Sequence, residues 1–270
     1  MTNNYESQLT RQRERDLASR QESESLLGRE VGIFRESMGL IISLWDEVLS
    51  ADSIDERLKD LTLKHKLTVL HYGFNLLWAA WEEALAGRYQ TATDHFRSIE
   101  ECPDFLLALW LKPELSNDWT DRTSLNAKTA RRTIADALKQ PGAGSDLLRS
   151  MQIAATGVQA FSHVSVQSLG QALPLKEEEG GMRLLVRLGG EVSPISLTLV
   201  AAQIVNSTLQ LLGAALLAFD DVVRLEPELF ERWFRRIAEH RDTLAGQRDG
   251  LRDVAPAHGL LFAASQTATD

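Results

Sequence analysis

The sequence ISLTLVAAQIVNSTLQLLGAALLAF, residues 195–219, decides the fold, because it is long, apolar and free of charged residues. It is the main part of an uncharged stretch that runs from Val192 to Phe219. A helix that is apolar nearly all round must be surrounded by other elements, so this segment predicts the centre of an all-α helical bundle. Pro194 is expected in its first turn, since the fixed φ of proline suits the start of a helix.

The same segment is long enough to span a bilayer, which takes ~20 residues. Two features favour a soluble core helix instead. The segment is followed by Asp220-Asp221 and not by the Lys/Arg cluster typical of a cytoplasmic boundary. It also carries a polar stripe at helical spacing, formed by Gln203, Asn206, Ser207 and Gln210. We therefore expect no membrane insertion.

Composition and charge narrow the class of protein. Hydrophobic residues make up 44% of the 270 residues and charged residues 25%, as in a globular protein with a real core. The net charge of −9 repels phosphate backbones and argues against broad nucleic-acid affinity. The single cysteine, Cys102, permits no intrachain disulfide, and the polar N-terminus has no apolar segment of the secretory type. These features predict a cytoplasmic protein.

Apolar residues at i, i+3 and i+4 spacing predict further helices on both sides of the central one. We expect Pro103 to kink or break the helix that begins near Tyr89, and Gly87 to end the helix before it. Ser53 and Glu56 form a capping-box pattern, and residues 114–124 read as a loop. The bundle then has six or seven helices, over residues 31–49, 54–85, 89–113, 124–139, 146–173, 194–219 and 227–246.

One small β element is expected within the bundle. The segments MRLLVRL (182–188) and EVSPISL (191–197) flank Gly189-Gly190, and glycine supplies the positive φ that tight hairpin turns need. The predicted hairpin covers about 181–198. The predicted organisation is a polar N-terminal arm (1–27), a helical bundle domain (28–249) and a flexible tail (250–270).

The patterns for common catalytic and metal sites are missing from the sequence. None of the six histidines has an acidic residue three positions before it, as helical carboxylate–metal sites require. There is no phosphate-binding Gly-rich loop and no Gly-x-Ser-x-Gly elbow. We therefore expect no metal and no cofactor.

His163 lies on a polar stripe of the predicted 146–173 helix, with Gln159 and Gln167 one turn away on either side. Two interpretations stay open. The stripe can face the amide stripe of the central helix in a hydrogen-bonded core layer, which is the favoured interpretation because buried polar groups generally find partners. Alternatively, Arg97 and Glu101 turn inward and meet His163 across a pocket. For that motif the favoured interpretation is an exposed ion pair of Arg97 with Glu100 or Glu101. The pocket would comprise His163, Arg97, Glu101, Ser162, Ser165, Gln159 and Gln167.

Four short features follow one another along the chain: Arg97-Ser98-Ile99-Glu100-Glu101, an apolar run with Trp110, a helix bearing Lys and Arg, and Ser162-His163-Val164-Ser165. Their order resembles a loose group of bacterial all-helical proteins that are similar to the HEPN and abortive-infection superfamily. The resemblance spans roughly residues 65 to 220 and implies a helical bundle, but no reaction. HEPN ribonucleases carry Arg-x(4–6)-His, and among three such spacings Arg235…His240 is the best placed, on a predicted helix.

Three functions remain as hypotheses. The absence of a strong catalytic motif favours a non-catalytic interaction or assembly protein, either a homodimer or a protein with another protein partner. The resemblance implies the alternative, a metal-independent ribonuclease or abortive-infection effector that uses His240 and Arg235 as catalytic residues and RNA as its partner. The third hypothesis is a small-ligand sensor with the His163 stripe as its pocket.

Overall fold

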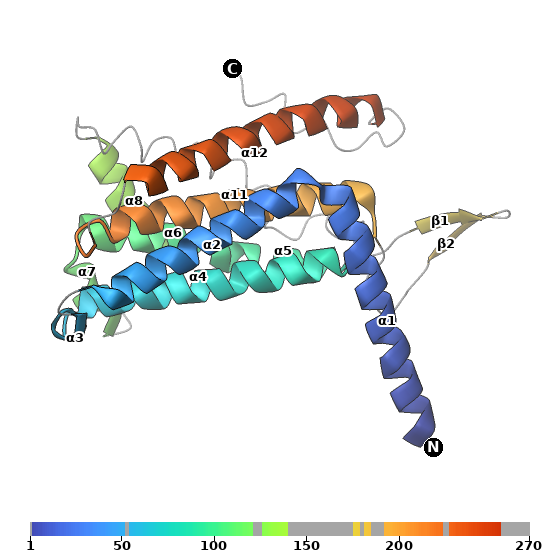
Figure 1. Cartoon of the computed structure of the whole chain (residues 1–270), viewed down its shortest axis with the longest axis horizontal. Helices are drawn as coiled ribbons and strands as arrows, with labels where there is room; N and C mark the ends of the chain where they lie inside the picture. Colours follow the sequence, from blue (N-terminus) through green and yellow to red (C-terminus); the bar gives the residue numbers. More distant parts are fainter. Residues whose placement is uncertain are drawn as a thin grey trace.

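The computed structural model describes residues 2–51, 54–120, 126–139, 175–178, 181–184, 192–223 and 227–254. Over these residues the protein is predominantly helical, which confirms the all-α prediction. The long helix α11 (Pro194–Ala218) lies at the centre. Figure 1 shows α12 (Pro227–Val254) on one side of it and α4 (Leu61–Leu85) on the other, with α2 (Arg29–Ser50) across it.

Helix α11 is central because its side chains are apolar on nearly every face. Leu197, Ile204, Leu211 and Phe219 are completely buried. As predicted, Pro194 opens the helix, and the Ser193 side chain caps it by accepting a hydrogen bond from the backbone N–H of Ser196. Within the described residues, Ser196–Ala218 is the one stretch long and apolar enough to cross a membrane, and 89% of an apolar 18-residue window within it is buried inside the protein.

Two glycines allow other helices to approach α11 closely. A Cβ on Gly73 of α4 would lie 2.9 Å from Leu211, and one on Gly213 would overlap the indole ring of Trp233. Trp233 of α12 is fixed in that position because its Nε1 donates a hydrogen bond to the carbonyl of Leu209, at 2.9 Å. These contacts hold α4 and α12 against opposite sides of the central helix.

The segment predicted as one helix over 54–85 forms two helices. A single turn, α3 (Ile54–Arg57), precedes α4. The break has a local cause: the Asp60 carboxylate accepts a hydrogen bond from the N–H of Thr62, at 2.9 Å, and so starts a new helix. Gly87, with φ of +73°, follows the end of α4, which confirms the predicted stop. Ser53 of the predicted capping box lies outside the described residues.

Pro103 lies inside a continuous helix, so the predicted break at this residue is wrong. Helix α6 (Phe96–Leu111) runs through it, and the chain is interrupted earlier, at His95, after α5 (Tyr89–Asp94). Side chains on both sides of the proline are buried in the core, including Ile99 and Leu106, and this tertiary packing offsets the missing backbone hydrogen bond.

The segment after α6 also differs from the prediction. A short helix, α7 (Leu115–Thr120), occupies part of the predicted loop. Helix α8 (Ala127–Leu138) is capped by Asn126, whose side chain accepts a hydrogen bond from the N–H of Thr129, at 3.0 Å; the predicted cap, Ser124, lies outside the described residues. Helix α8 packs on α6 through Ala130 and Ile134.

The strands pair earlier in the chain than predicted. β1 (Leu175–Glu178) and β2 (Gly181–Leu184) form an antiparallel pair, with Leu175 opposite Leu184. Residues 194–198, placed in the predicted hairpin, are instead the first turn of α11, because Ser193 and Pro194 start the helix there. The predicted turn at Gly189-Gly190 lies outside the described residues.

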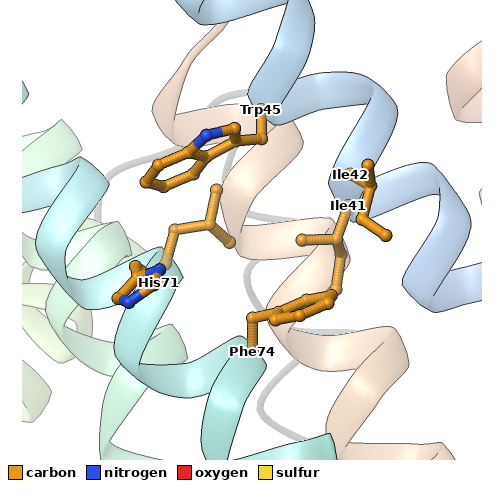
Figure 2. Close-up of a pocket in the computed structure, with 6 residues that line it drawn as sticks. Ile41, Ile42, Trp45, His71 and Phe74 are labelled. Atoms are coloured by element: carbon orange, nitrogen blue, oxygen red, sulfur yellow. The ribbon is translucent and has the colours of Figure 1, made fainter.

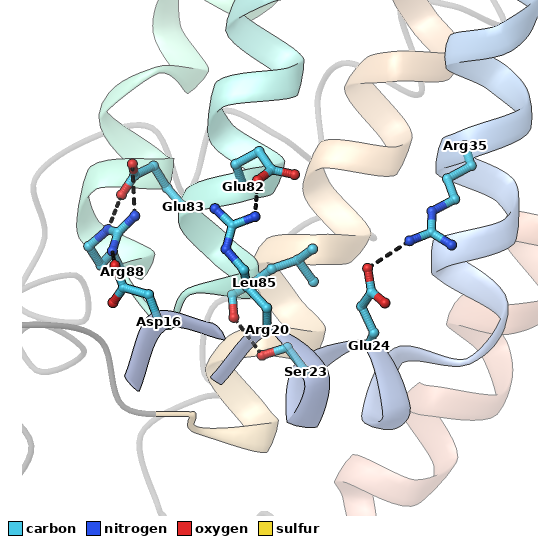
Figure 3. A network of polar contacts seen from close by, with 9 residues as sticks. All are labelled: Asp16, Arg20, Ser23, Glu24, Arg35, Glu82, Glu83, Leu85 and Arg88. Atoms are coloured by element: carbon cyan, nitrogen blue, oxygen red, sulfur yellow. Dashed lines mark hydrogen bonds and ion pairs between the residues drawn. The ribbon is translucent and has the colours of Figure 1, made fainter. Parts of the chain in front are cut away.

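The predicted polar arm is a helix, α1 (Thr2–Leu27), and Figure 1 shows its N-terminal half projecting away from the bundle. Gly28, with φ of +50°, separates it from α2. The second half of α1 is docked on α4 by the network in Figure 3, in which Arg88 binds Asp16 and Glu83, Arg20 binds Glu82, and Ser23 Oγ donates to the carbonyl of Leu85. At the other end, α12 continues past its predicted end to Val254.

Candidate functional site

Helices α2 and α4 carry a second apolar surface besides the one that packs on α11. Ile42 of α2 and Trp78 of α4 are 48% and 47% exposed, which is high for large apolar side chains on two neighbouring helices. Three residues on each helix form this surface at i, i+3 and i+7 spacing, which places them on one side of the helix. We call it the α2–α4 face: Ile42, Trp45 and Leu49 on α2, and His71, Phe74 and Trp78 on α4.

Aromatic rings join the two helices along this face. At one end Phe34 of α2 stacks on Trp81 of α4, with ring centroids 4.2 Å apart, and contacts Trp78 at 6.2 Å. At the other end the rings of Trp45 and His71 lie 5.8 Å apart. Both helices pack along α11, so α11 forms the floor beneath the rings. Rings are rigid and keep their shape when exposed, which makes the face a preformed surface.

A pocket of about 140 Å³ opens within the face, between α2 and α4 (Figure 2). Trp45 covers one end of it, Phe74 the other, and His71 stands at the rim. Pockets that enclose a drug-sized ligand have volumes of roughly 300–1,000 Å³. This pocket is smaller and suits a single apolar side chain. Its lining residues are Ile41, Ile42, Trp45, Leu70, His71 and Phe74.

The six residues of the face are apolar or aromatic, with one titratable group among them. None of its six residues is Asp, Glu, Lys or Arg, although the protein carries a net charge of −9. His71 is the one titratable group that lines the pocket, and its Nε2 shares a hydrogen bond with Asn75, at 2.9 Å. Acid–base or nucleophilic catalysis needs a second group positioned beside the first, and the pocket lining supplies none.

The residues predicted to surround His163 are only partly described. Arg97 and Glu101 form an ion pair with each other, with Nε and Oε1 3.6 Å apart, and the Arg97 side chain is 83% exposed. They therefore make the ion pair that is the favoured interpretation of this motif, and not the inward-facing pair of the pocket. His163, Ser162, Ser165, Gln159 and Gln167 lie outside the described residues.

The structure does not bring Arg235 and His240 together. Both lie on α12, but Arg235 is exposed, whereas His240 is 4% exposed and faces α11 near Ala202. Burial lowers the pKa of His240 to about 4, with a smaller opposing effect from the backbone of Ala202. Neither ring nitrogen has a hydrogen bond of good geometry. A neutral, enclosed imidazole cannot contact RNA without movement of α12, so this geometry lends the ribonuclease hypothesis no support.

A carboxylate cluster between α6 and α8 was missed in the sequence. Asp104 accepts a hydrogen bond from Arg131 Nε, at 2.8 Å, and burial raises the pKa of Asp104. Burial also raises the pKa of Glu100 to about 7, opposed by the charge of Arg131 and reinforced by Asp104 and Glu101. Glu100 Oε1 is buried without a hydrogen bond. No local motif marks the cluster, because Arg131 comes from a different helix.

The polar stripe of α11 is buried, and the stripe around His163 that was predicted to face it lies outside the described residues. Gln203, Ser207 and Gln210 are 8%, 1% and 6% exposed. Among the described residues, the side-chain nitrogens of both glutamines and the Ser207 hydroxyl have no hydrogen-bond partner. Within the described ranges, no three His, Cys, Asp or Glu side chains are grouped so that they could hold a metal ion.

No protein-family model, curated protein or solved structure matches this chain.

Proposed function

We propose that this is a non-catalytic interaction protein and that the α2–α4 face is its binding surface. The observation that carries the proposal is the combination of exposed aromatic side chains with a small apolar pocket on one uncharged surface. Trp and Tyr are enriched at the centres of protein interfaces, where an anchor residue fills a desolvated pocket. Exposed apolar surfaces of this kind usually mark binding sites, since water disfavours them.

The pocket supports a protein partner better than a metabolite. A free small ligand needs several convergent polar groups to fix its orientation, and the polar groups of this pocket's lining side chains are the imidazole of His71 and the indole N–H of Trp45. A protein partner needs fewer orienting polar groups in any one pocket, because the rest of its contact extends along both helices. Helices α2 and α4 with α11 beneath them present such an elongated surface.

Site-specific photo-crosslinking in living cells tests the proposal. A photo-reactive amino acid replaces Ile42, which is 48% exposed on the face, and in a second variant it replaces Phe234, which is 53% exposed on α12. The proposal predicts discrete covalent adducts from position 42 and few from position 234. Absence of any adduct at position 42, either with another protein or with a second copy of the chain, would show that the face is not a binding surface.

A further inference from the structure

We infer that the partner of the α2–α4 face is a second copy of this chain, in a twofold-symmetric dimer in which Trp78 of each copy enters the pocket of the other. This inference rests on the proposed function and adds the identity of the partner. In a twofold interface the same patch serves both copies, so it must carry both a projecting group and a matching recess. The α2–α4 face carries both, Trp78 and the pocket beside His71.

The spacing of the two features fits a twofold axis. His71 and Trp78 lie seven residues apart on α4, which corresponds to about 10 Å along a helix. A twofold axis that lies in the plane of the interface, runs perpendicular to α4 and passes midway between them, beside Phe74 and Asn75, places the partner's Trp78 over this pocket. The same rotation places this Trp78 over the partner's pocket, so both contacts form at once and the two α4 helices meet near Asn75, running in opposite directions.

The size of the face limits how tightly two copies can bind. Its residues extend from 42 to 49 on α2 and from 71 to 78 on α4, about 10 Å along each helix, and two neighbouring helices have a combined width of about 20 Å. These six residues therefore offer about 200 Å² per copy, against the roughly 800 Å² per partner of a standard interface, so the rest of the contact has to come from the flanking turns of both helices. A dimer centred on so small an apolar patch is expected to be weak.

Charge also selects this face for self-association. Two copies that each carry −9 repel each other over most of their surfaces. The six residues of the α2–α4 face are uncharged, so contact between two such faces brings together fewer like charges than contact elsewhere, although the exposed Asp46 lies beside Trp45. A partner of opposite charge would instead be expected to contact an acidic surface, which this face does not present.

Light scattering and sedimentation of the full chain and four variants test the inference. Trp78→Ser removes the projecting group, and Ile42→Glu places a charge at the pocket rim. Each is expected to raise the dimer dissociation constant at least about 30-fold, as the loss of an interface hot spot does. Phe234→Ser is the matched control, an equally exposed aromatic residue on α12, and should leave the constant unchanged. Far-UV circular dichroism and melting temperature confirm that each variant is folded.

The decisive variant combines Ile42→Glu with Trp78→Lys. In the inferred pairing the new lysine of one copy meets the new glutamate of the other, so the double variant should dimerise more tightly than Ile42→Glu alone. If the double variant dimerises no more tightly than Ile42→Glu alone, the pairing is wrong.

A native chain that stays monomeric at several hundred micromolar would overturn the dimer, while adducts from position 42 with a different protein would still support the proposed function. If the native chain stays monomeric and position 42 also gives no adduct, both the dimer and the proposed function are wrong.

Discussion

Two glycines in helices have opposite surroundings. Gly213 of α11 lies against the indole ring of Trp233, and an added methyl group would overlap that ring. Trp233 cannot move aside easily, because its Nε1–H is hydrogen-bonded to Leu209. Gly32 of α2 is exposed, and a methyl group added there would have no atom of another residue within 4 Å. Glycine is therefore needed at position 213, whereas at position 32 it only weakens the helix.

Gly213→Ala should lower the free energy of unfolding by about 1–3 kcal/mol, the cost of overpacking a filled core. Gly32→Ala should raise it by about 0.5–1 kcal/mol, since alanine is the better helix former. Denaturant unfolding followed by circular dichroism measures both. A neutral or stabilising Gly213→Ala would mean that α12 does not pack on α11 through Trp233.

Glu100 should make stability depend on pH. The pKa of Glu100 is raised to about 7 in the folded protein, above its ordinary value of 4.5, so the folded state binds the proton more tightly than the unfolded state. This contribution is present below about pH 4.5 and is lost as the pH rises through 7. Glu100→Gln keeps the shape of the protonated acid, so it should be more stable than the native chain at pH 8 and similar to it at pH 4.5.

His240 makes stability depend on pH in the opposite direction, so variants are needed to separate its contribution from that of Glu100. The pKa of His240 is lowered to about 4, and its contribution to stability is present above the unfolded value near 6.5 and lost as the pH falls toward 4. In the native chain, the measured pH dependence of stability is the sum of these two opposing contributions. Melting curves at pH 5 and pH 8 for native, Glu100→Gln and Glu101→Gln chains isolate the first effect. Equal responses of the two glutamine variants would contradict the role given to Glu100.

Among the elements, α1 is divided into a projecting half and a docked half. Leu9 and Leu17 are 62% and 58% exposed, whereas Ser23 and Leu27 are buried. The docked half contacts the bundle through Asp16, which binds Arg88, and through Arg20 and Ser23, which bind α4. An isolated helix of about 15 residues is marginal in water, so the projecting half should open easily while the docked half stays closed.

Brief trypsin digestion should therefore cut after Arg11, Arg13 and Arg15 before it cuts after Arg20. Arg20 binds Glu82, and the neighbouring Ser23 is bonded to α4, so local opening there costs more. Mass spectrometry of the new N-termini identifies the order of cutting. Arg88→Ala removes the partner of Asp16 and should extend early cleavage to Arg20. Protection of Arg11 to Arg15 in the native chain would instead place the projecting half in an interface.

At the scale of the whole molecule, net charge and the uncharged face act against each other. Repulsion between two copies that each carry −9 is screened by salt, with a Debye length of ~10 Å at 0.1 M, whereas burial of an apolar face is not weakened by salt. The inferred dimer should therefore tighten as sodium chloride rises from 50 to 500 mM, measured by sedimentation. Weakening over that range would indicate an interface held by ion pairs, and therefore a different surface.

The sequence by itself determined the class of fold and its centre. An uncharged segment of this length has to be enclosed, so the position of α11 follows from its composition alone. The start of α11 at Pro194 and the end of α4 before Gly87 follow from single residues that favour those backbone conformations. Local signals identify such features because their physical cause lies within a few residues. The same local reasoning failed at Pro103, where the burial of Ile99 and Leu106 against other helices keeps the helix continuous.

Only the tertiary structure decided which surfaces are available for function. Ile42 and Trp78 follow the same apolar periodicity as core residues, and the sequence cannot distinguish them from Leu44 or Leu77, which are completely buried. Likewise Arg235 and His240 look like a pair in the sequence, yet α11 covers one and leaves the other in solvent. Periodicity shows which side of a helix is apolar, but exposure depends on which other helix covers that side, and this is a property of the assembled bundle.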